Sequence, residues 1–348
     1  MILETILIIL LIILLLVVSH ELGHFLVAKW FNVRVDEFGV GIPPRLFGKR
    51  YGETVYSINW LPIGGFVKIF GEEEDINESR SFTAQGFWVR SMIVAAGVAA
   101  NVFVGFLIFS FLAWYGTPRF FVEVAGVAKD SPAELAGFRS GDLIIGFDER
   151  TGETLEVLAV ESYIANHKDR DASFVVRRGG EQLIIHGVPR TNPPAGQGAL
   201  GITIEPKEFG IIRVPWYRAP FEGIKSTFKF LWLIVYGLGF LLKELLTHGS
   251  APGEVMGPVG IAQVAEQTFH VGLYYFLQLI GFLSLNLAVI NILPIPALDG
   301  GRILFFVLEK IKGTPIPTHV SRFIHSFFMM LLIALLLWIT LYDIARII

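Results

Sequence analysis

The 348-residue chain contains no cysteine and few charged residues. Without cysteine it can form no disulfide bond, and any bound metal ion must be held by histidine and carboxylate side chains. Charged residues make up 17% of the sequence, whereas soluble proteins carry about 25%. The formal net charge of −3 provides no basic surplus for nucleic acid. The composition therefore predicts a membrane protein that does not bind nucleic acid.

Four apolar runs are long enough to cross a bilayer, which requires roughly 20 apolar residues in a helix. The predicted spans are residues 1–31, 89–115, 271–301 and 323–348. No Lys or Arg precedes the first run and no small-residue cleavage site follows it, which predicts an uncleaved span and not a signal peptide. A fifth apolar run, residues 230–242, is short enough to favour a helix in the membrane interface. The region 207–270 is therefore predicted to be interfacial, with a fifth span as the alternative.

Two segments outside the apolar runs are predicted to contain strands. Residues 33–70 are rich in β-branched and aromatic residues separated by Gly and Pro, a pattern typical of strands. Residues 71–80 are predicted to be a solvated loop. Residues 117–206 have a soluble composition, with helical and strand-like stretches and a hairpin turn at Gly179-Gly180. Their stretch SPAELAGFRSGDLIIGFD resembles the PDZ domains of bacterial proteases, so one α+β PDZ domain is expected there.

The positive charges of the connections predict the orientation of the chain. The connection 32–88 and the predicted loop 302–322 are rich in Lys and Arg. By the positive-inside rule, both are expected on the cytoplasmic side of the membrane. The two termini and the domain at 117–206 are then expected outside.

The first predicted span contains the sequence H-E-L-G-H, from His20 to His24. On a helix the two histidines share one face, about 6 Å apart along the axis, so both rings can bind one cation. Glu21 can reach a water molecule at that cation as a general base, which is the pattern of zinc hydrolases. Two unrelated histidines are the alternative, but three ionisable groups in a lipid-length run require a functional reason.

A catalytic zinc site usually needs a third protein ligand, and no later histidine has the spacing of the soluble metzincins. The remaining candidate is Asp299, in the stretch NILPIPALDGG at 291–301. At about 1.5 Å per residue, His20 and Asn291 lie roughly 28 Å and roughly 30 Å along spans that both enter from outside. Both motifs are therefore expected at one depth, unless residues 230–242 also cross the membrane. An ordinary Asp-Gly turn after a proline-rich helix end is the alternative.

The two motifs, the four spans and the PDZ-like insert resemble the site-2 proteases, which are zinc-dependent intramembrane proteases. The nearest resemblance is to the bacterial regulator-of-sigma-E-protease type with a single PDZ domain. The resemblance implies that one zinc ion per chain is bound by His20, His24 and Asp299. It also implies that Glu21 is the catalytic base and that Asn291 holds the substrate backbone. Residues 33–70 are then expected to form a membrane-re-entrant sheet whose edge pairs with an extended substrate strand.

The expected fold is a polytopic α-helical membrane protein with about four spans, a membrane-associated β-sheet and one extracytoplasmic PDZ domain. The expected activity is cleavage of single-span membrane proteins, such as anti-sigma factors or remnant signal peptides, in the bacterial cytoplasmic (inner) membrane, with the active site toward the cytoplasm. The sequence does not identify the substrate, the oligomeric state or the ligand of the PDZ domain, which could bind C-termini or exclude bulky ectodomains. A transporter or channel would predict internal repeats, and none is found. A non-catalytic PDZ scaffold would leave Glu21 unexplained.

Overall fold

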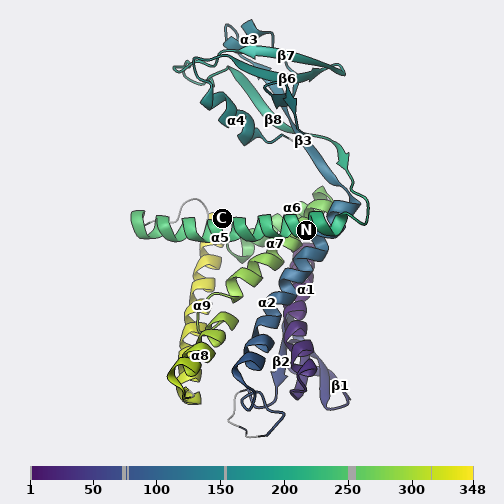
Figure 1. Ribbon diagram of the computed structural model, residues 1–348, viewed down its shortest axis with the longest axis vertical. Coiled ribbons are helices and arrows are strands. Elements are labelled where there is room, and N and C mark those ends of the chain that lie inside the picture. The colour runs from purple at the N-terminus through teal and green to yellow at the C-terminus, as the bar shows by residue number, and fades with distance from the viewer. Residues whose placement is uncertain are drawn as a thin grey trace. The chain divides into compact units, whose positions relative to one another are not determined.

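A computed structural model describes residues 2–72, 76, 78–152, 155–249, 256–314 and 316–347 (Figure 1). The chain forms two compact units, Met1–Trp114 with Pro215–Ile348, and Tyr115–Val214. The predicted loop at 71–80 lies partly outside the described residues, which omit 73–75 and 77. The helices of the first unit are α1 (Ile2–Trp30), α2 (Phe87–Tyr115), α5 (Ala219–His248), α6 (Pro258–Val271), α7 (Leu273–Asn291), α8 (Asp299–Lys312) and α9 (Thr318–Ile347).

Helices α1, α2, α7 and α9 overlap the four predicted spans, but α7 ends at Asn291, ten residues before the predicted end of the third span at 301. α2 packs closely against α1 and α7 because glycine lies at the points of contact. A Cβ added at Gly23 would lie 2.2 Å from the carbonyl oxygen of Ala96, and one added at Gly105 would lie 2.6 Å from Leu285 Cδ2. Small residues allow membrane helices to approach each other in this way. Gly23 belongs to H-E-L-G-H, so this packing holds the motif against α2.

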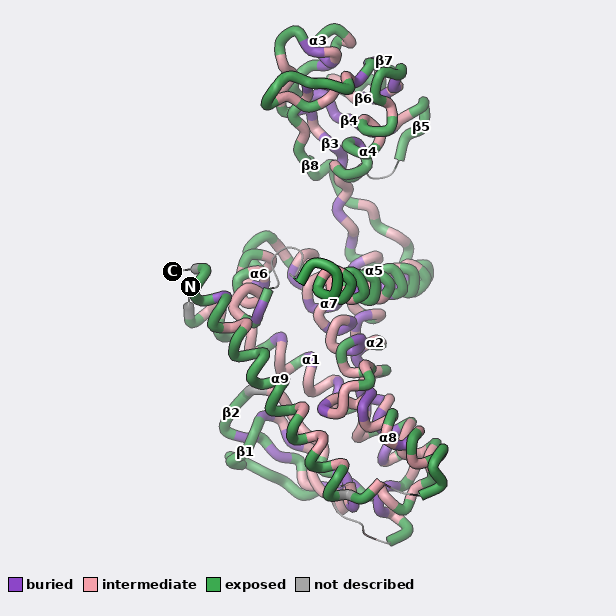
Figure 2. The backbone as a smooth tube through the Cα atoms, turned by 90° about the vertical axis from the view of Figure 1, so that its left-hand side faces the viewer, coloured by how far each residue is buried: buried purple, intermediate pink, exposed green. Residues whose placement is uncertain are grey.

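By length and composition, five described helices could cross a membrane, and the fifth is α5. α5 is 30 residues long, much longer than the apolar run 230–242, because amphipathic flanks extend it at both ends. It crosses the direction of α1, α2 and α7 and is exposed along most of its length (Figure 1 and Figure 2). On its buried side, the ring of Phe230 stacks on that of Phe109, with centroids 4.8 Å apart.

The segment 302–322, predicted as a loop, is helical as far as Lys312, the end of α8. It was predicted as a loop because it connects two apolar runs, but residues 299–312 form a short amphipathic helix. Phe306 is buried in a core shared with Ile93 and Val94 of α2. The burial of Phe306 therefore holds α8 against α2, although α8 also carries charged residues.

The segment predicted to contain strands forms an antiparallel sheet of β1 (Val35–Tyr51) and β2 (Thr54–Ile69). Both strands bend, so that β1 pairs with two runs of β2. The resulting order of runs is Gly65–Ile69, Val35–Val40, Val55–Asn59 and Arg45–Arg50. The run Gly65–Ile69 is therefore an edge, and no described strand pairs with its outer side.

The second unit is α+β, and its described residues form an antiparallel sheet and two helices. Its elements are β3 (Thr117–Val127), α3 (Pro132–Ala136), β4 (Leu143–Phe147), β5 (Arg150–Thr151), α4 (Val157–Asn166), β6 (Ala172–Arg178), β7 (Glu181–Gly187) and β8 (Ile202–Ile212). The sheet order is β7-β6-β4-β3-β8, and β5 pairs with β4. The predicted hairpin turn joins β6 to β7 at Gly179 and Gly180, whose φ angles of 59° and 95° favour glycine. Assignment of this unit as a PDZ domain rests on the sequence resemblance.

Candidate active site

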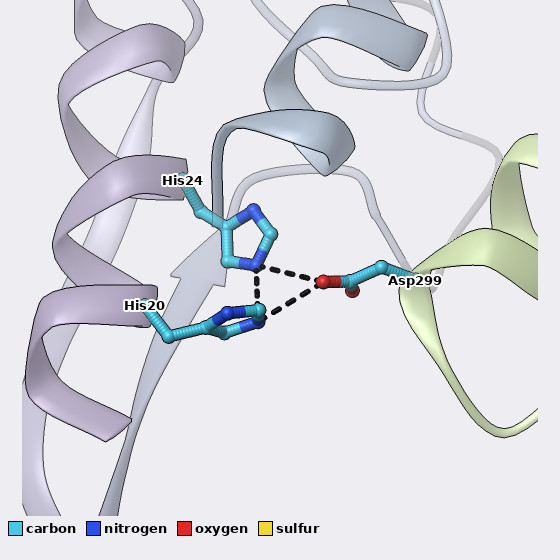
Figure 3. A group of neighbouring side chains, drawn as sticks. All are labelled: His20, His24 and Asp299. Atoms are coloured by element: carbon cyan, nitrogen blue, oxygen red, sulfur yellow. Dashed lines mark hydrogen bonds and ion pairs between the residues drawn. The ribbon is translucent and has the colours of Figure 1, made fainter. Parts of the chain in front are cut away.

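The structure brings the two sequence motifs together at α1 and the start of α8 (Figure 3). His20 Nε2 and His24 Nε2 lie 3.0 Å and 3.5 Å from Asp299 Oδ2, and 3.1 Å from each other. The possible ligand atoms of the three residues all lie within 4.8 Å of one another. One cation can therefore contact two imidazoles and a carboxylate at this point.

The side-chain nitrogen and oxygen atoms that meet at this point carry lone pairs. There are too few protons among them for every lone pair to accept a hydrogen bond. His24 Nδ1 lies 2.8 Å from the carbonyl oxygen of Ile93, and a carbonyl can only accept, so the His24 proton is on Nδ1. Its Nε2 then presents a lone pair to the site. Asp299 Oδ2 is buried and has no hydrogen-bond partner. A divalent cation would satisfy these atoms, and two histidines with a carboxylate are a common zinc ligand set.

Asn101 of α2 supports His20 from behind. It is fully buried, its amide nitrogen Nδ2 lies 3.3 Å from His20 Nδ1, and its amide oxygen Oδ1 lies 3.1 Å from Ser19 Oγ. The Ser19 hydroxyl donates its one proton to the carbonyl of Leu16 at 2.9 Å, so it can accept from the Asn101 NH₂ group. Exchanging the amide oxygen and nitrogen, which have nearly the same shape, meets this requirement and turns the oxygen toward His20 Nδ1. Nδ1–H then donates to Asn101, and Nε2 is left free for a metal.

Gly97 gives the two rings their space against α2. A Cβ at this position would lie 2.4 Å from His24 Nε2 and 2.7 Å from His20 Cε1. Ile93, Gly97 and Asn101 follow each other at four-residue intervals and so lie on one face of α2. This face borders the site. The sequence analysis did not identify these residues. The sequence did contain a signal for them, namely a polar Asn in a predicted span one helical turn after a Gly.

The glycines after Asp299 let α8 begin close to the preceding loop. A Cβ at Gly300 would lie 2.1 Å from the carbonyl oxygen of Ile292, and one at Gly301 would lie 2.2 Å from that of Ile295. His325 of α9 donates through Nδ1 to the carbonyl of Pro296 at 2.8 Å. Both contacts fix the loop that carries Asp299.

A cavity of about 220 Å³ opens beside the three candidate ligands. It is lined by Val17, His20, Glu21, Leu287, Asn291, Ala297, Leu298 and Asp299. All of the predicted site residues therefore line this cavity or, in the case of His24, contact a residue that does. Asn291, the last residue of α7, makes no side-chain hydrogen bond within the described part of the chain. Its amide can reach a group in the cavity.

Replacing Asn101 by Leu is expected to weaken zinc binding by about 10–100-fold, the usual effect of losing a ligand's supporting partner. The reason is that Leu cannot accept the proton of His20 Nδ1, whereas the carboxylate introduced by Asn101→Asp can. Competition with a chelator measures the affinity. Ser284→Ala is a matched control, because it removes only a bond to the Asn101 backbone carbonyl. Unchanged zinc affinity in Asn101→Leu would contradict the assignment.

Comparison with known proteins matches residues 8–335 to the model of peptidase family M50. A Clostridium perfringens protein is 33% identical over 94% of this chain and 95% of its own length, and its name assigns it provisionally to the zinc metalloproteases. The zinc metalloprotease RasP of Geobacillus kaustophilus is 26% identical over 99% of this chain and 98% of its own length. The match covers both motifs and every element of the cavity. The chain belongs to peptidase family M50, the site-2 proteases, and is a zinc-dependent metalloendopeptidase of the membrane.

Proposed function

We propose that this protein cleaves the membrane-spanning segments of single-span membrane proteins, with His20, His24 and Asp299 as zinc ligands and Glu21 as catalytic base. The observation that carries the proposal is the position of the site. The two histidines and the glutamate lie on α1, a helix long and apolar enough to cross a membrane. They adjoin a cavity that is also lined by Asn291, at the end of α7, and Asp299, at the start of α8.

The residues of the cavity can divide the work of peptide hydrolysis between them. Zinc, when bound, supplies a Lewis acid that activates water and polarises the scissile carbonyl. The Glu21 carboxylate accepts a proton from the attacking water and passes it to the leaving amine. The Asn291 amide can both donate to and accept from the substrate backbone. Asn101 and the Ile93 carbonyl hold the imidazole rings in orientation.

The edge of the β1–β2 sheet is suited to hold the substrate in an extended form. Gly65 begins the unpaired edge, and a Cβ at that position would lie 3.7 Å from Glu21 Cγ and 3.8 Å from Val18 Cγ2. A helical substrate has its peptide groups paired internally, so cleavage requires an extended stretch. Strand addition to this edge would supply the missing backbone partners.

The topology we propose has four spans, α1, α2, α7 and α9, with α5 in the membrane interface. The crossing direction of α5 supports this, because a helix at a large angle to its neighbours cannot share their path through the bilayer (Figure 1). The Lys and Arg content of the connections supports a cytoplasmic position for the site and an outer position for Tyr115–Val214. By the family resemblance, the membrane is the bacterial inner membrane and the substrates are anti-sigma factors or remnant signal peptides.

The proposed function is tested with purified protein in detergent and a single-span substrate. Cleavage is expected without chelator, is expected to stop when zinc is removed, and is expected to return when zinc is restored. The products are followed by gel electrophoresis. Absence of cleavage by the zinc-loaded protein toward a panel of single-span substrates would contradict the proposal.

Asn291→Ala is expected to retain zinc and thermal stability but to lower kcat/KM, because the variant loses a contact to the substrate backbone. The alternative role is a helix-ending Asn that satisfies its own chain, which is typical of Asn at helix ends. Zinc content, melting temperature and kcat/KM are measured together. Unfolding or zinc loss, with unchanged cleavage per bound zinc, would assign Asn291 to the structural role.

Deleting residues 117–206 and joining the ends with a flexible linker is expected to leave the zinc site intact. Every proposed site residue lies in the other compact unit. If the deleted domain excludes bulky ectodomains, the variant will cleave substrates with a large outer domain that the intact protein rejects. Cleavage rates are compared for one span carrying small or large outer domains. Unchanged size discrimination in a zinc-bound deletion variant would show that the filter lies elsewhere.

A further inference from the structure

An ion pair joins the helix that begins with Asp299 to the strand whose edge faces the site. Arg302 lies three residues after Asp299, in the first turn of α8, and Glu72 lies three residues after the end of β2. Arg302 Nη1 contacts Glu72 Oε1. The Glu72 side chain is 14% exposed and the Arg302 side chain 39% exposed, so the pair is shielded on the Glu72 side and reaches solvent on the Arg302 side.

Within the described ranges of the chain, this pair is the polar contact between α8 and the turn that follows β2, and no hydrogen bond or ion pair joins α8 to β1 or β2 themselves. The second ion pair of α8, between Arg90 Nη2 and Glu309 Oε2 at 2.9 Å, holds its other end to α2. The two pairs therefore fix the two ends of α8 to different elements. The pair at the Asp299 end is a polar link between α8 and the turn after β2, and it adds to the apolar core that Phe306 of α8 shares with Val35 and Ile69 of the sheet.

The Arg302 guanidinium also lies within electrostatic reach of the catalytic cavity. The negative charge of Glu72 raises the pKa of Arg302, desolvation opposes this, and the charges of Asp299 and Glu21 act in the same direction as Glu72. Arg302 therefore stays charged. Arg302 is not a candidate zinc ligand. It can therefore pair with Glu72 and leave the proposed ligand set unchanged.

Glu72 lines a groove of about 490 Å³ that follows the end of β2. The groove is formed by Asp36, Ile76 and the residues from Phe66 to Glu72. Asp299 lines the separate cavity at the candidate metal site. The Arg302–Glu72 pair thus links the wall of the groove beside the edge strand to the helix that supplies a candidate ligand.

We infer that the Arg302–Glu72 ion pair sets the spacing between the substrate-holding edge of β2 and the metal-binding end of α8, so that both are positioning residues for the extended substrate. The inference rests on the proposed function. A substrate strand that pairs with Gly65–Ile69 and reaches the metal must contact both elements that the pair connects. A shift of about 1 Å between them can lower the rate by as much as 10²-fold, because the reacting groups lose alignment.

The test uses the full-length protein and three variants, Glu72→Arg, Arg302→Glu and the double variant with both changes. Each single variant is expected to lower kcat/KM by at least about 10-fold while it retains one zinc per chain. The double variant restores an ion pair of reversed polarity and is expected to recover most of the loss. Lys225→Glu, which reverses one charge of an exposed pair on α5, is the matched control and is expected to have no effect.

Substrate affinity is measured in parallel in a Glu21→Gln background, where no turnover is needed for the result. Weaker binding in each single variant and recovery in the double variant support the inference even if the chosen substrate is not cleaved. Failure of the native protein to cleave would instead contradict the proposed function. Arg302→Gln, a smaller change, replaces Arg302→Glu if the latter does not fold. Zinc loss in the single variants, or no recovery in the double variant, would overturn the inference.

Discussion

Glu21→Gln is expected to lower peptide cleavage by about 10²–10⁴-fold or more, the usual contribution of a general base. Gln has nearly the shape of Glu but cannot accept a proton from water. The fold and the zinc content are expected to remain, because Glu21 is not among the three candidate ligands. Single-turnover cleavage and metal analysis of the same preparation measure the two properties separately.

Glu222→Gln is a matched control for this substitution. Glu222 lies on α5 in an exposed pair with Lys225, so its neutralisation is expected to leave cleavage unchanged. Near-normal cleavage by Glu21→Gln would contradict the proposed mechanism. Zinc loss in Glu21→Gln would instead show that Glu21 contributes to the metal site.

Alanine at His20, His24 or Asp299 is expected to abolish stable zinc binding and, with it, cleavage. Each change removes one of the three proposed ligands, and no cysteine is present to replace it. The loss of affinity is expected to exceed the roughly 10–100-fold typical of changes to a supporting residue. Metal analysis of purified variants, with zinc counted per chain, measures the effect.

The matched control for the histidine variants is His186→Ala. His186 lies on β7 and pairs with Asp171 in an exposed position, so its loss is expected to leave the zinc content at one per chain. Full zinc occupancy in Asp299→Ala would remove Asp299 from the ligand set. The site would then need a third ligand from another part of the cavity.

The sequence predicted the parts of the site that depend on helical spacing and membrane depth. The four-residue interval between His20 and His24 places both rings on one face of any helix, whatever surrounds it. Equal depth along two spans predicted that Asp299 could meet them, and the structure places its carboxylate 3.0 Å from His20 Nε2. The roles of these residues remain proposals.

The supporting residues could not be predicted in the same way, because they depend on which helix packs behind the motif. Asn101 and Gly97 have meaning only once α2 is known to lie against His20 and His24. Likewise, 302–322 was predicted as a loop because it connects two apolar runs. The burial of Phe306, which stabilises α8 as a helix, depends on contacts with α2.

The central claim is hydrolysis within a membrane span, and mass spectrometry of the cleavage products tests it most directly. A single-span substrate is incubated with the native protein and, in parallel, with Glu21→Gln, each in the presence and absence of a zinc chelator. The expected result is a new pair of termini inside the apolar segment, formed only by the native protein with zinc. Cleavage confined to residues outside that segment, or equal cleavage by Glu21→Gln, would contradict the account.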